Sequence, residues 1–288
     1  MTSTVALAWS GGDPPGGGLR FVKAEGLGND FLVIDARHGD LQALAATLQP
    51  DAPRLCDRRF GVGADGLLLV GAGIGATSDA TMLVINADGS RPQMCGNGLR
   101  CVALWLSRNG ASTSVLVDTD AGPRHCHVVD RVSSADVDVD MGAPQYDSSV
   151  VADRAHGRSF ARVSMGNPHA IAFVEAGEDP EELARRFGPG LERDPIFPEG
   201  TNVEFARVED GKVTLWVWER GCGITAACGT GACATVAAAV AQHLLRPGAP
   251  IEVALPGGSL WITVPRQADA GVRMSGPARL VYSGVWPA

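Results

Sequence analysis

The strongest constraint on the fold is a long internal repeat. The segment MCGNGLRCVA around Cys95 is echoed by ACGTGACATV around Cys228, which lies 133 positions later (228 − 95). The same offset separates two further pairs in matching places, Asn86 with Glu219 and Met141 with Met274. Repeat arrays have periods of about 20–50 residues. A period this long therefore predicts two duplicated domains rather than a solenoid.

Each half has short β-branched segments and one apolar helix after its cysteine motif. The expected strands are FLVID, GLLLV, TMLVIN, VLVDT and DVDVDM, followed by AIAFV, NVEFARV, VTLWVWE, IEVAL, LWITV and RLVYSGV. Gly, Pro, Asn and Asp bound them, as is typical of strands. We expect helices over 99–107 and 232–245, because Asn109-Gly110 and Pro247-Gly248 are stop signals. The second is apolar on nearly all sides, so it should be buried all round.

Residues 1–18 contain a short apolar patch and then a Gly/Pro cluster. A secretory signal needs a basic region and an apolar region of about 7–15 residues, and this segment has neither. We interpret it as a flexible leader, with the first domain starting near Leu19. The linker between the two halves is expected near Gly142–Pro144, which gives domains over 19–142 and 143–276.

Charge and cysteine content exclude several classes of protein. The 24 basic and 32 acidic residues give a net charge of −8, which disfavours nucleic acid or an anionic membrane as a partner. No apolar run approaches the ~20 residues of a membrane span. Seven cysteines are an odd number for a disulfide-stapled secreted domain. We therefore expect a cytoplasmic protein that acts on a small molecule.

The two cysteine motifs predict reactive thiols. Each cysteine precedes Gly-X-Gly and a helix start, where free amides and the helix dipole should lower a thiol pKa toward neutrality. The glycines would let the backbone cradle a carboxylate. One such motif alone is more often a turn with a small core residue. Two copies favour proton exchange at a carbon between two thiols, since inversion needs an acid and a base on opposite faces.

This chemistry needs no cofactor. Only Lys23 and Lys212 could form a Schiff base with pyridoxal phosphate, and neither has a convincing sequence context for it. No metal site is expected either.

Six segments carry a family resemblance. They are FVKAEGLGNDF, CDRRFGVGADGLLLV, NADGSRPQMCGNGLRC, SMGNPHAIAFV, GTNVEFARV and WERGCGITAACGTGACA. The sequence resembles the diaminopimelate epimerase family from about Phe21 to Val285. The resemblance implies an α/β fold of two pseudo-symmetric domains, each a mixed β-barrel-like sheet around a central helix. It also implies that residues 277–288 return to the first domain, that Cys95 and Cys228 are the acid/base pair, and that the protein forms a homodimer.

The resemblance further implies a substrate site for LL- and meso-diaminopimelate. The residues expected to hold the distal amino-acid end are Asn29, Asn86, Asn167, Asn202, Glu219 and Arg220. Gly96-Asn97 and Gly229-Thr230 would cradle the reacting carboxylate, and His169 and Glu219 would tune the thiols. Taken singly, the asparagines could be turn or strand-end caps, His169 a structural histidine and Arg220 a surface ion-pair residue. Their joint fit to one ligand favours the site.

One position departs from the family pattern. Ile224 stands where the family usually has Glu, and Cys222 is an additional thiol. This leaves open an epimerase for another amino acid. A dehydratase of 3-hydroxyproline type needs only one thiol and is disfavoured by the presence of two, and a non-catalytic binding protein is the weakest alternative. The remaining cysteines are assigned to packing: Cys56, Cys101, Cys126 and Cys233.

Overall fold

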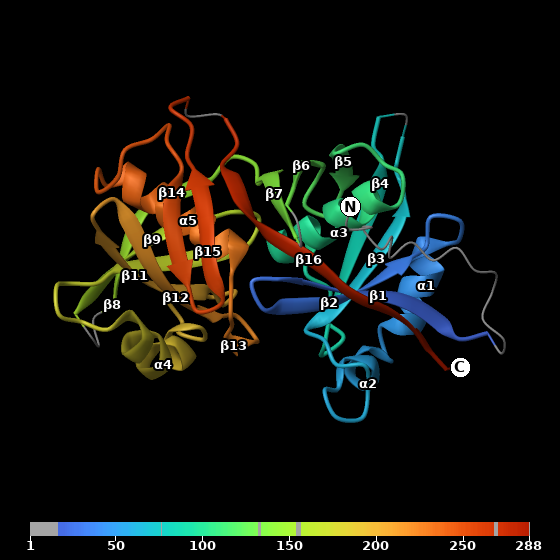
Figure 1. Ribbon diagram of the computed structural model, residues 1–288. Helices are drawn as coiled ribbons and strands as arrows, with labels where there is room; N and C mark the ends of the chain where they lie inside the picture. Colours follow the sequence, from blue (N-terminus) through green and yellow to red (C-terminus); the bar gives the residue numbers. More distant parts are fainter. Residues whose placement is uncertain (1–16, 76, 132–133, 154–156, 268–269, 288) are drawn as a thin grey trace. The chain divides into compact units, whose positions relative to one another are not determined.

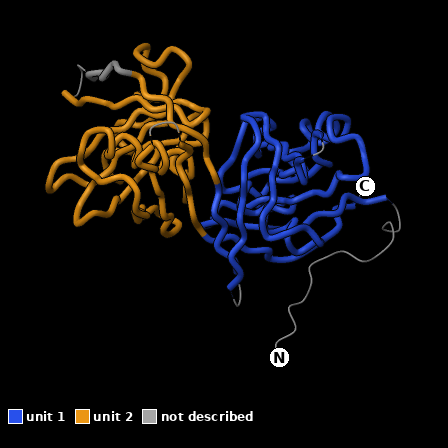
Figure 2. Tube along the Cα trace, turned by 90° about the horizontal axis from the view of Figure 1, so that it is seen from above, with its two compact units in different colours: residues 1–139, 277–288 blue, residues 140–276 orange. Residues whose placement is uncertain are grey.

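The computed structural model describes residues 17–75, 77–131, 134–153, 157–267 and 270–287. The chain divides into two compact units, shown in blue and orange in Figure 2. Unit 1 runs up to Val139 and resumes at Pro277, and unit 2 is Asp140–Gly276. Most of the expected leader, residues 1–18, lies outside the described residues. Each unit is described below by itself.

Unit 1 is a closed ring of strands around one helix (Figure 1). Its strands are β1 (Leu19–Gly26), β2 (Asn29–Asp35), β3 (Gly66–Ala72), β4 (Ala80–Asn86), β5 (Ser114–Asp118), β6 (Arg124–Asp130), β7 (Ala135–Asp140) and the second half of β16 (Arg273–Trp286). They pair in this order, and β16 pairs antiparallel with β1 to close the ring. Helix α3 (Gly96–Arg108) contacts strands β1 to β6 and is therefore the centre of the unit.

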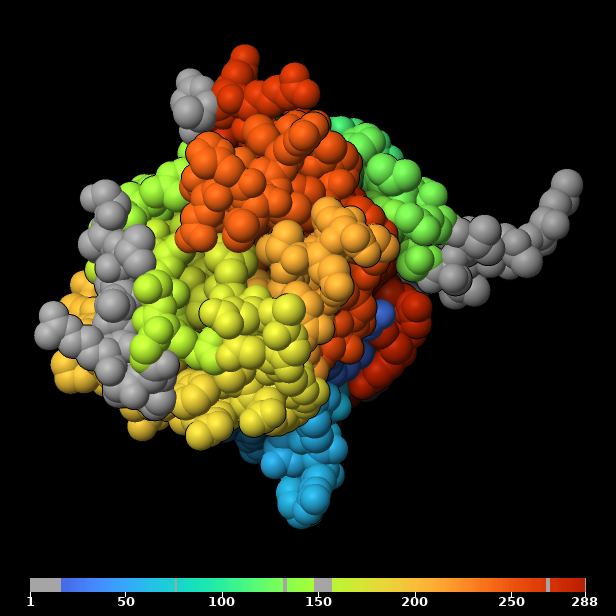
Figure 3. All heavy atoms as spheres, turned by 90° about the vertical axis from the view of Figure 1, so that its left-hand side faces the viewer, coloured from blue at the N-terminus to red at the C-terminus, as the bar shows by residue number. Residues whose placement is uncertain are grey.

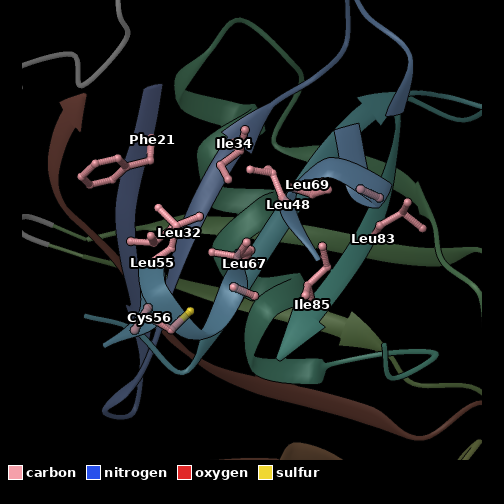
Figure 4. Close-up of a cluster of buried hydrophobic side chains, with 13 residues drawn as sticks. Phe21, Leu32, Ile34, Leu48, Leu55, Cys56, Leu67, Leu69, Leu83 and Ile85 are labelled. Atoms are coloured by element: carbon pink, nitrogen blue, oxygen red, sulfur yellow. The ribbon is translucent and has the colours of Figure 1, made fainter. Parts of the chain in front are cut away.

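Two short helices cover the outer face of this sheet. They are α1 (Leu41–Leu48) and α2 (Ala52–Cys56). Side chains alternate between the two faces of a strand, so Leu32, Leu67 and Ile85 pack against these helices, as Figure 4 shows. The intervening residues face α3. Both faces of the sheet are thus buried, which explains the nearly continuous apolar runs in β3 and β4.

Unit 2 repeats the order of strands and the central helix of unit 1. Its strands are β8 (Gln145–Asp153), β9 (Arg158–Ser164), β10 (Pro168–Phe173), β11 (Asn202–Glu209), β12 (Lys212–Glu219), β13 (Gly223–Ile224), β14 (Ile251–Leu255), β15 (Gly258–Thr263) and the first half of β16. The pairs β10–β11 and β12–β14 are parallel, as β2–β3 and β4–β5 are in unit 1. The sequence repeat therefore reappears as a repeat of strand topology.

The central helix of unit 2 is α5 (Gly229–Ala241), which contacts β9 to β12 and β15. Helix α4 (Pro180–Leu191) covers the other face of β11 and β12 and lies at the surface in Figure 3 (yellow). Its apolar side packs on a cluster that includes Phe160, Val203 and Phe205. The side chains between these residues point toward α5, and this alternation positions the candidate site.

The predicted fold class is confirmed, with one helix end corrected. The helix expected over 232–245 begins earlier, at Gly229, and ends at Ala241. His243 adopts a left-handed φ of 61°, which terminates the helix, and the amide of Leu244 bonds back to the carbonyl of Ala239. As expected, α5 is buried on all sides through Ala239. The helix expected over 99–107 lies within α3.

Candidate active site

Both repeat cysteines occupy the residue that caps a central helix. Cys95 and Cys228 have extended backbones, with φ of −137° and −119°, and the helices begin at the glycines that follow them. The Gly98 amide donates to Sγ of Cys95 at 3.4 Å. The first turn of α3 therefore points an amide toward the thiol of Cys95.

In unit 1, polar side chains gather at one edge of β2, β3 and β4, beside the start of α3. Asn29 begins β2, and its Oδ1 accepts a hydrogen bond of 3.0 Å from Nδ2 of Asn97. Nδ2 of Asn29 donates to Oδ2 of Asp65 at 2.7 Å. Asp65 was not singled out in the sequence analysis. Because a carboxylate only accepts hydrogen bonds, it fixes which way both amides point.

Ion pairs hold Asp65 and the nearby Asp30 in place. Arg58 bonds Asp65 at 2.6 Å and Asp30 at 2.6 Å, and Lys23 contacts Asp30 at 2.5 Å. Lys23 is only 8% exposed and also donates to the Gly63 carbonyl. These cations hold the pKa of Asp30 below its usual value, against the opposing effect of burial. One of the two lysines of the chain is thus committed to an ion pair.

Asn86 ends β4 and pairs with Gly66, the first residue of β3, so it lies at the same edge of the sheet. Its side chain does not bond the Asn29 pair and instead donates to Oγ of Ser90 at 2.9 Å. Gly96 is buried in the first turn of α3. The structure therefore brings together Asn29, Asn97 and the Cys95 turn, with Asn86 nearby in the sheet.

In unit 2, strand alternation directs three titratable side chains toward α5. Val203 and Phe205 belong to the cluster under α4, so Glu204 faces α5. The same alternation applies to His169 on β10 and Glu219 on β12. A Cβ built on Gly231 of α5 would lie 2.9 Å from Oε1 of Glu204 and 3.2 Å from Sγ of Cys228. Glu204 and Cys228 therefore meet at the first turn of α5.

A chain of hydrogen bonds links these groups. Nδ1 of His169 is 2.6 Å from Oε1 of Glu204, and Nε2 is 3.0 Å from Oδ1 of Asn167. Nδ2 of Asn167 donates to the hydroxyl of Thr230 at 3.3 Å, and this hydroxyl is 3.6 Å from Sγ of Cys228. His169 is 2% exposed. Gly229 and Thr230 are both buried in the same turn.

The remaining expected residues lie at the adjoining strand ends. Asn202 is buried; its Oδ1 accepts from the Arg220 amide at 2.9 Å and its Nδ2 donates to the Pro168 carbonyl at 2.9 Å. The exposed guanidinium of Arg220 donates to the Glu199 carbonyl at 2.9 Å. Glu219 accepts a hydrogen bond from the hydroxyl of Thr225. A cavity of about 550 Å³ near His169 is lined by residues of β8, β9, β10 and the segment 197–201.

The expectation of a lowered thiol pKa is wrong for Cys228. Burial raises the pKa of this thiol well above its ordinary value, and the nearby carboxylates of Glu219 and Glu204 raise it further. The hydroxyl of Thr230 and the amide of Gly231 lower it, but they do not compensate. The pKa of Glu219 is itself raised by burial, partly offset by its hydrogen bonds to Thr225 and Cys228. Burial, together with two carboxyl groups, thus outweighs the donors that lower the pKa of Cys228.

The two departures from the family pattern are accommodated locally. Ile224 lies on β13, pairs with Trp218 and packs against the cluster under α4. Cys222 is exposed in the turn between β12 and β13. The four cysteines assigned to packing are buried. Burial raises the pKa of Cys56 to about 11 and that of Cys101 to about 12.

Within the described part of the chain, no helix is long and apolar enough to cross a membrane. Among the same residues, no group of three or more His, Cys, Asp or Glu side chains is arranged to hold a metal ion.

Comparison with known proteins identifies the family. The diaminopimelate epimerase family model matches residues 21–146 and 161–281. A diaminopimelate epimerase of Desulforudis audaxviator is 44% identical over 93% of this chain and 99% of its own length. One from Xanthomonas campestris is 42% identical, covering 94% and 97% of the two chains.

Solved structures show the same fold at low sequence identity. A hydroxyproline epimerase from Agrobacterium vitis, solved with bound trans-4-hydroxy-L-proline, superposes with a TM-score of 0.72 at 17% identity. The alignment covers 93% of this chain and 92% of that one. The family match spans both units and includes both cysteine turns, so the chain is a member of the diaminopimelate epimerase family and an isomerase.

Proposed function

We propose that the protein interconverts LL- and meso-diaminopimelate by moving a proton at one α-carbon, with Cys95 and Cys228 as the two proton-transferring groups. The observation that carries this proposal is the duplication of one device, a thiol capping a buried helix. Inversion without a cofactor needs two such groups acting on opposite faces of the carbon. The family's substrate gives the reaction its place in lysine and cell-wall precursor synthesis.

The reaction also requires stabilisation of the negative charge that develops as the proton leaves, and the amides at the start of each helix supply it. Removing the α-proton shifts negative charge onto the adjacent carboxylate, and preorganised N–H donors stabilise that charge. The turns Gly96-Asn97 and Gly229-Thr230 offer such donors beside each thiol. The distal ammonium and carboxylate would be held by Asn29, Asn86, Asn167, Asn202, Glu219 and Arg220. An arginine fork suits a carboxylate, and amide or carboxylate oxygens suit an ammonium.

The lysines support a mechanism without pyridoxal phosphate. Lys23 is buried in its ion pair with Asp30. Lys212 is exposed and pairs with Glu252 at 2.8 Å. Both amines are thus engaged by carboxylates.

Isotope exchange tests this function directly. Incubation with LL-diaminopimelate in deuterated water should yield meso product that carries deuterium at the inverted carbon, measured by NMR and mass spectrometry. Exchange on another amino acid, with none on diaminopimelate, would overturn the substrate and favour a specialised epimerase. Ile224 gives that alternative little support, since its side chain serves the packing of unit 2.

The thiols are tested by substitution. Cys95→Ala and Cys228→Ala should each lower epimerisation by at least 10²–10⁴-fold, the usual contribution of an acid–base group. Cys126→Ala is the matched control, because this buried thiol is remote in sequence from both helix starts, and it should keep near-normal turnover. Near-normal turnover in either helix-capping variant would contradict the assigned role.

We further propose that the protein is cytoplasmic and forms a homodimer. Light scattering during size-exclusion chromatography measures the oligomeric state, because a dimer would have twice the chain mass of 29.9 kDa.

A further inference from the structure

A buried carboxyl group lies behind His169 with only one of its oxygens engaged. Glu204 is fully buried, and its Oε1 contacts Nδ1 of His169 at 2.6 Å. Its Oε2 is buried with no hydrogen-bond partner among the described residues. Burial raises the pKa of this carboxyl group. Burying a carboxyl group with an unpaired oxygen is costly, so its position calls for a role.

The protonation of the Glu204–His169 pair determines which hydrogen His169 presents on its other side. A fully buried pair avoids net charge. It can be neutral overall in two ways, as a carboxylic acid beside neutral imidazole or as a carboxylate beside imidazolium. In the first state the acid proton is on Oε1 and is donated to Nδ1, because a proton on Oε2 would have no acceptor among the described residues. In both states Nε2 then carries a hydrogen. Removing the carboxyl group would remove this constraint.

The hydrogen on Nε2 sets the direction of the bonds that follow. It donates to Oδ1 of Asn167, so the amide nitrogen of Asn167 must face Thr230, as the 3.3 Å contact with its hydroxyl requires. The hydroxyl of Thr230 accepts this bond, which leaves its own hydrogen for Sγ of Cys228 at 3.6 Å. A donor aimed at sulfur stabilises the thiolate.

We propose that Glu204 is a positioning residue, which locks His169 with its hydrogen on Nε2 and thereby orients the Asn167–Thr230 relay as a donor to Cys228. This inference deepens the proposed function and rests on it only for its effect on rate. Glu204 acts through His169, Asn167 and Thr230 and need not touch the substrate. The orientation of the relay itself is a property of the folded unit.

The orientation can be measured without any substrate. In protein labelled with ¹⁵N-histidine, the nitrogen signals distinguish protonated from bare ring nitrogens, and a His169→Gln spectrum assigns His169. The proposal expects a protonated Nε2 near neutral pH in the unmodified protein. In Glu204→Gln, the amide can either donate to Nδ1 or accept from it, so a population with bare Nε2 should appear. A bare Nε2 in the unmodified protein would overturn the proposal.

A double-mutant cycle tests the route of the effect. Glu204→Gln and Thr230→Val should each slow epimerisation roughly ten- to a hundredfold, as expected for one hydrogen bond to a charged group. If Glu204 acts through Thr230, the double variant should be no slower than Thr230→Val alone. Losses that multiply would show that Glu204 acts by another route and would overturn the proposal.

The matched control is Glu252→Gln, which removes a carboxylate that pairs with Lys212 outside this site and should change neither readout. Thermal melts check that each variant folds. If Glu204→Gln does not fold, the histidine spectrum of the unmodified protein still tests the proposal. An enzyme inactive on diaminopimelate but with protonated Nε2 would refute the proposed function alone. An active enzyme with bare Nε2 would refute only the role of Glu204.

Discussion

At the scale of single residues, the site of unit 2 is built from groups that are unfavourable to bury. Glu204 and Glu219 both have a raised pKa, and together they raise that of Cys228. Each would be more stable in water, so the rest of unit 2 must hold them in place. Buried titratable groups with a perturbed pKa are typical of functional sites.

Glu219→Gln should therefore stabilise the protein while removing activity. A neutral amide can still accept from Thr225 and avoids burying charge, so we expect a gain of roughly 0.5–2 kcal/mol in unfolding free energy at pH 7. The folded-state pKa of Glu219 lies above its ordinary 4.5, so the penalty in the unmodified protein is absent below about pH 4.5, grows as the pH rises toward the folded-state pKa and is constant above it.

Urea unfolding at several pH values measures this. The difference between the variant and the unmodified protein should shrink as the pH falls toward 4.5. The Glu252→Gln control should show no such gain, since Glu252 is paired with Lys212 and its pKa is lowered. A variant that is less stable than the unmodified protein at pH 7 would contradict the account.

The sequence motifs and the family resemblance pointed to the two thiols and to Glu219, but not to Glu204. Cys95 and Cys228 are recognisable because a repeat marks them and glycines follow. Glu204 lies between Val203 and Phe205 in a strand, where its neighbours suggest a solvent-facing polar residue. Only the presence of helices on both faces of the sheet makes it buried. Asp65 is similar, since its role depends on Arg58 and Asn29 meeting it in space.

At the scale of elements, the first turn of each central helix has a different role from the rest of the helix. Their first turns carry glycines because other groups approach closely there. A Cβ at Gly98 would lie 2.7 Å from a side-chain atom of Leu68, and one at Gly231 would displace Glu204. The remainder of α5 consists of small residues, which are alanine and valine apart from Cys233 and Thr235, and this lets strands pack near it on all sides. Chemistry is thus confined to the first turn.

Gly231→Ala should lower epimerisation roughly tenfold or more, because the methyl group pushes the carboxyl of Glu204 and the thiol of Cys228 from their positions. Gly190→Ala in α4 is the matched control, since a Cβ there meets nothing within 4 Å. It should keep activity and gain about 0.5–1 kcal/mol, the helix preference of alanine over glycine. Steady-state kinetics and thermal melts of both variants provide the measurement. Equal activities would show that Gly231 is needed only for flexibility.

Strands with strong apolar patterns were predictable, whereas polar elements were not. The expected strands FLVID, GLLLV and VTLWVWE lie within β2, β3 and β12. Strand β9 (RSFARVS) buries only two of seven residues, so its composition does not separate it from a loop. Helix α4 was missed although Asp179 caps it and Pro180 is at its start, both recognisable signals. The end of α5 was misplaced because Leu244 and Leu245 continue the apolar pattern beyond His243.

At the scale of the whole molecule, the chain ends with a strand shared by the two units. The first half of β16 pairs with β15, and the second half pairs with β1. Tyr282 packs edge-on against Phe21, and the guanidinium of Arg54 lies over Trp286. Within unit 1, Nε of Arg100 on α3 donates to the carbonyl of Pro277, so the returning strand is also bonded to the central helix.

Deleting residues 277–288 should therefore unfold unit 1, rather than remove one strand and leave the rest of the unit folded. The deletion opens the ring at β1 and removes this acceptor from the buried Arg100, and a hydrogen bond to a charged group contributes about 1.5–3 kcal/mol. Hydrogen exchange should show loss of protection in β1 and α3. Deleting only residues 287–288, beyond the end of β16, is the control and should leave protection unchanged. Retained protection in the longer deletion would contradict the role of the strand.

The shared strand also determines the order in which the protein can be completed during synthesis. Strand β1 is translated long before the second half of β16, the strand that pairs with it. At 5–20 residues per second, about 250 residues separate the two, so β1 remains an unpaired edge for roughly 10–50 s. Unit 2 is almost entirely translated within that interval. The half of the enzyme that leaves the ribosome first is thus the last to become native.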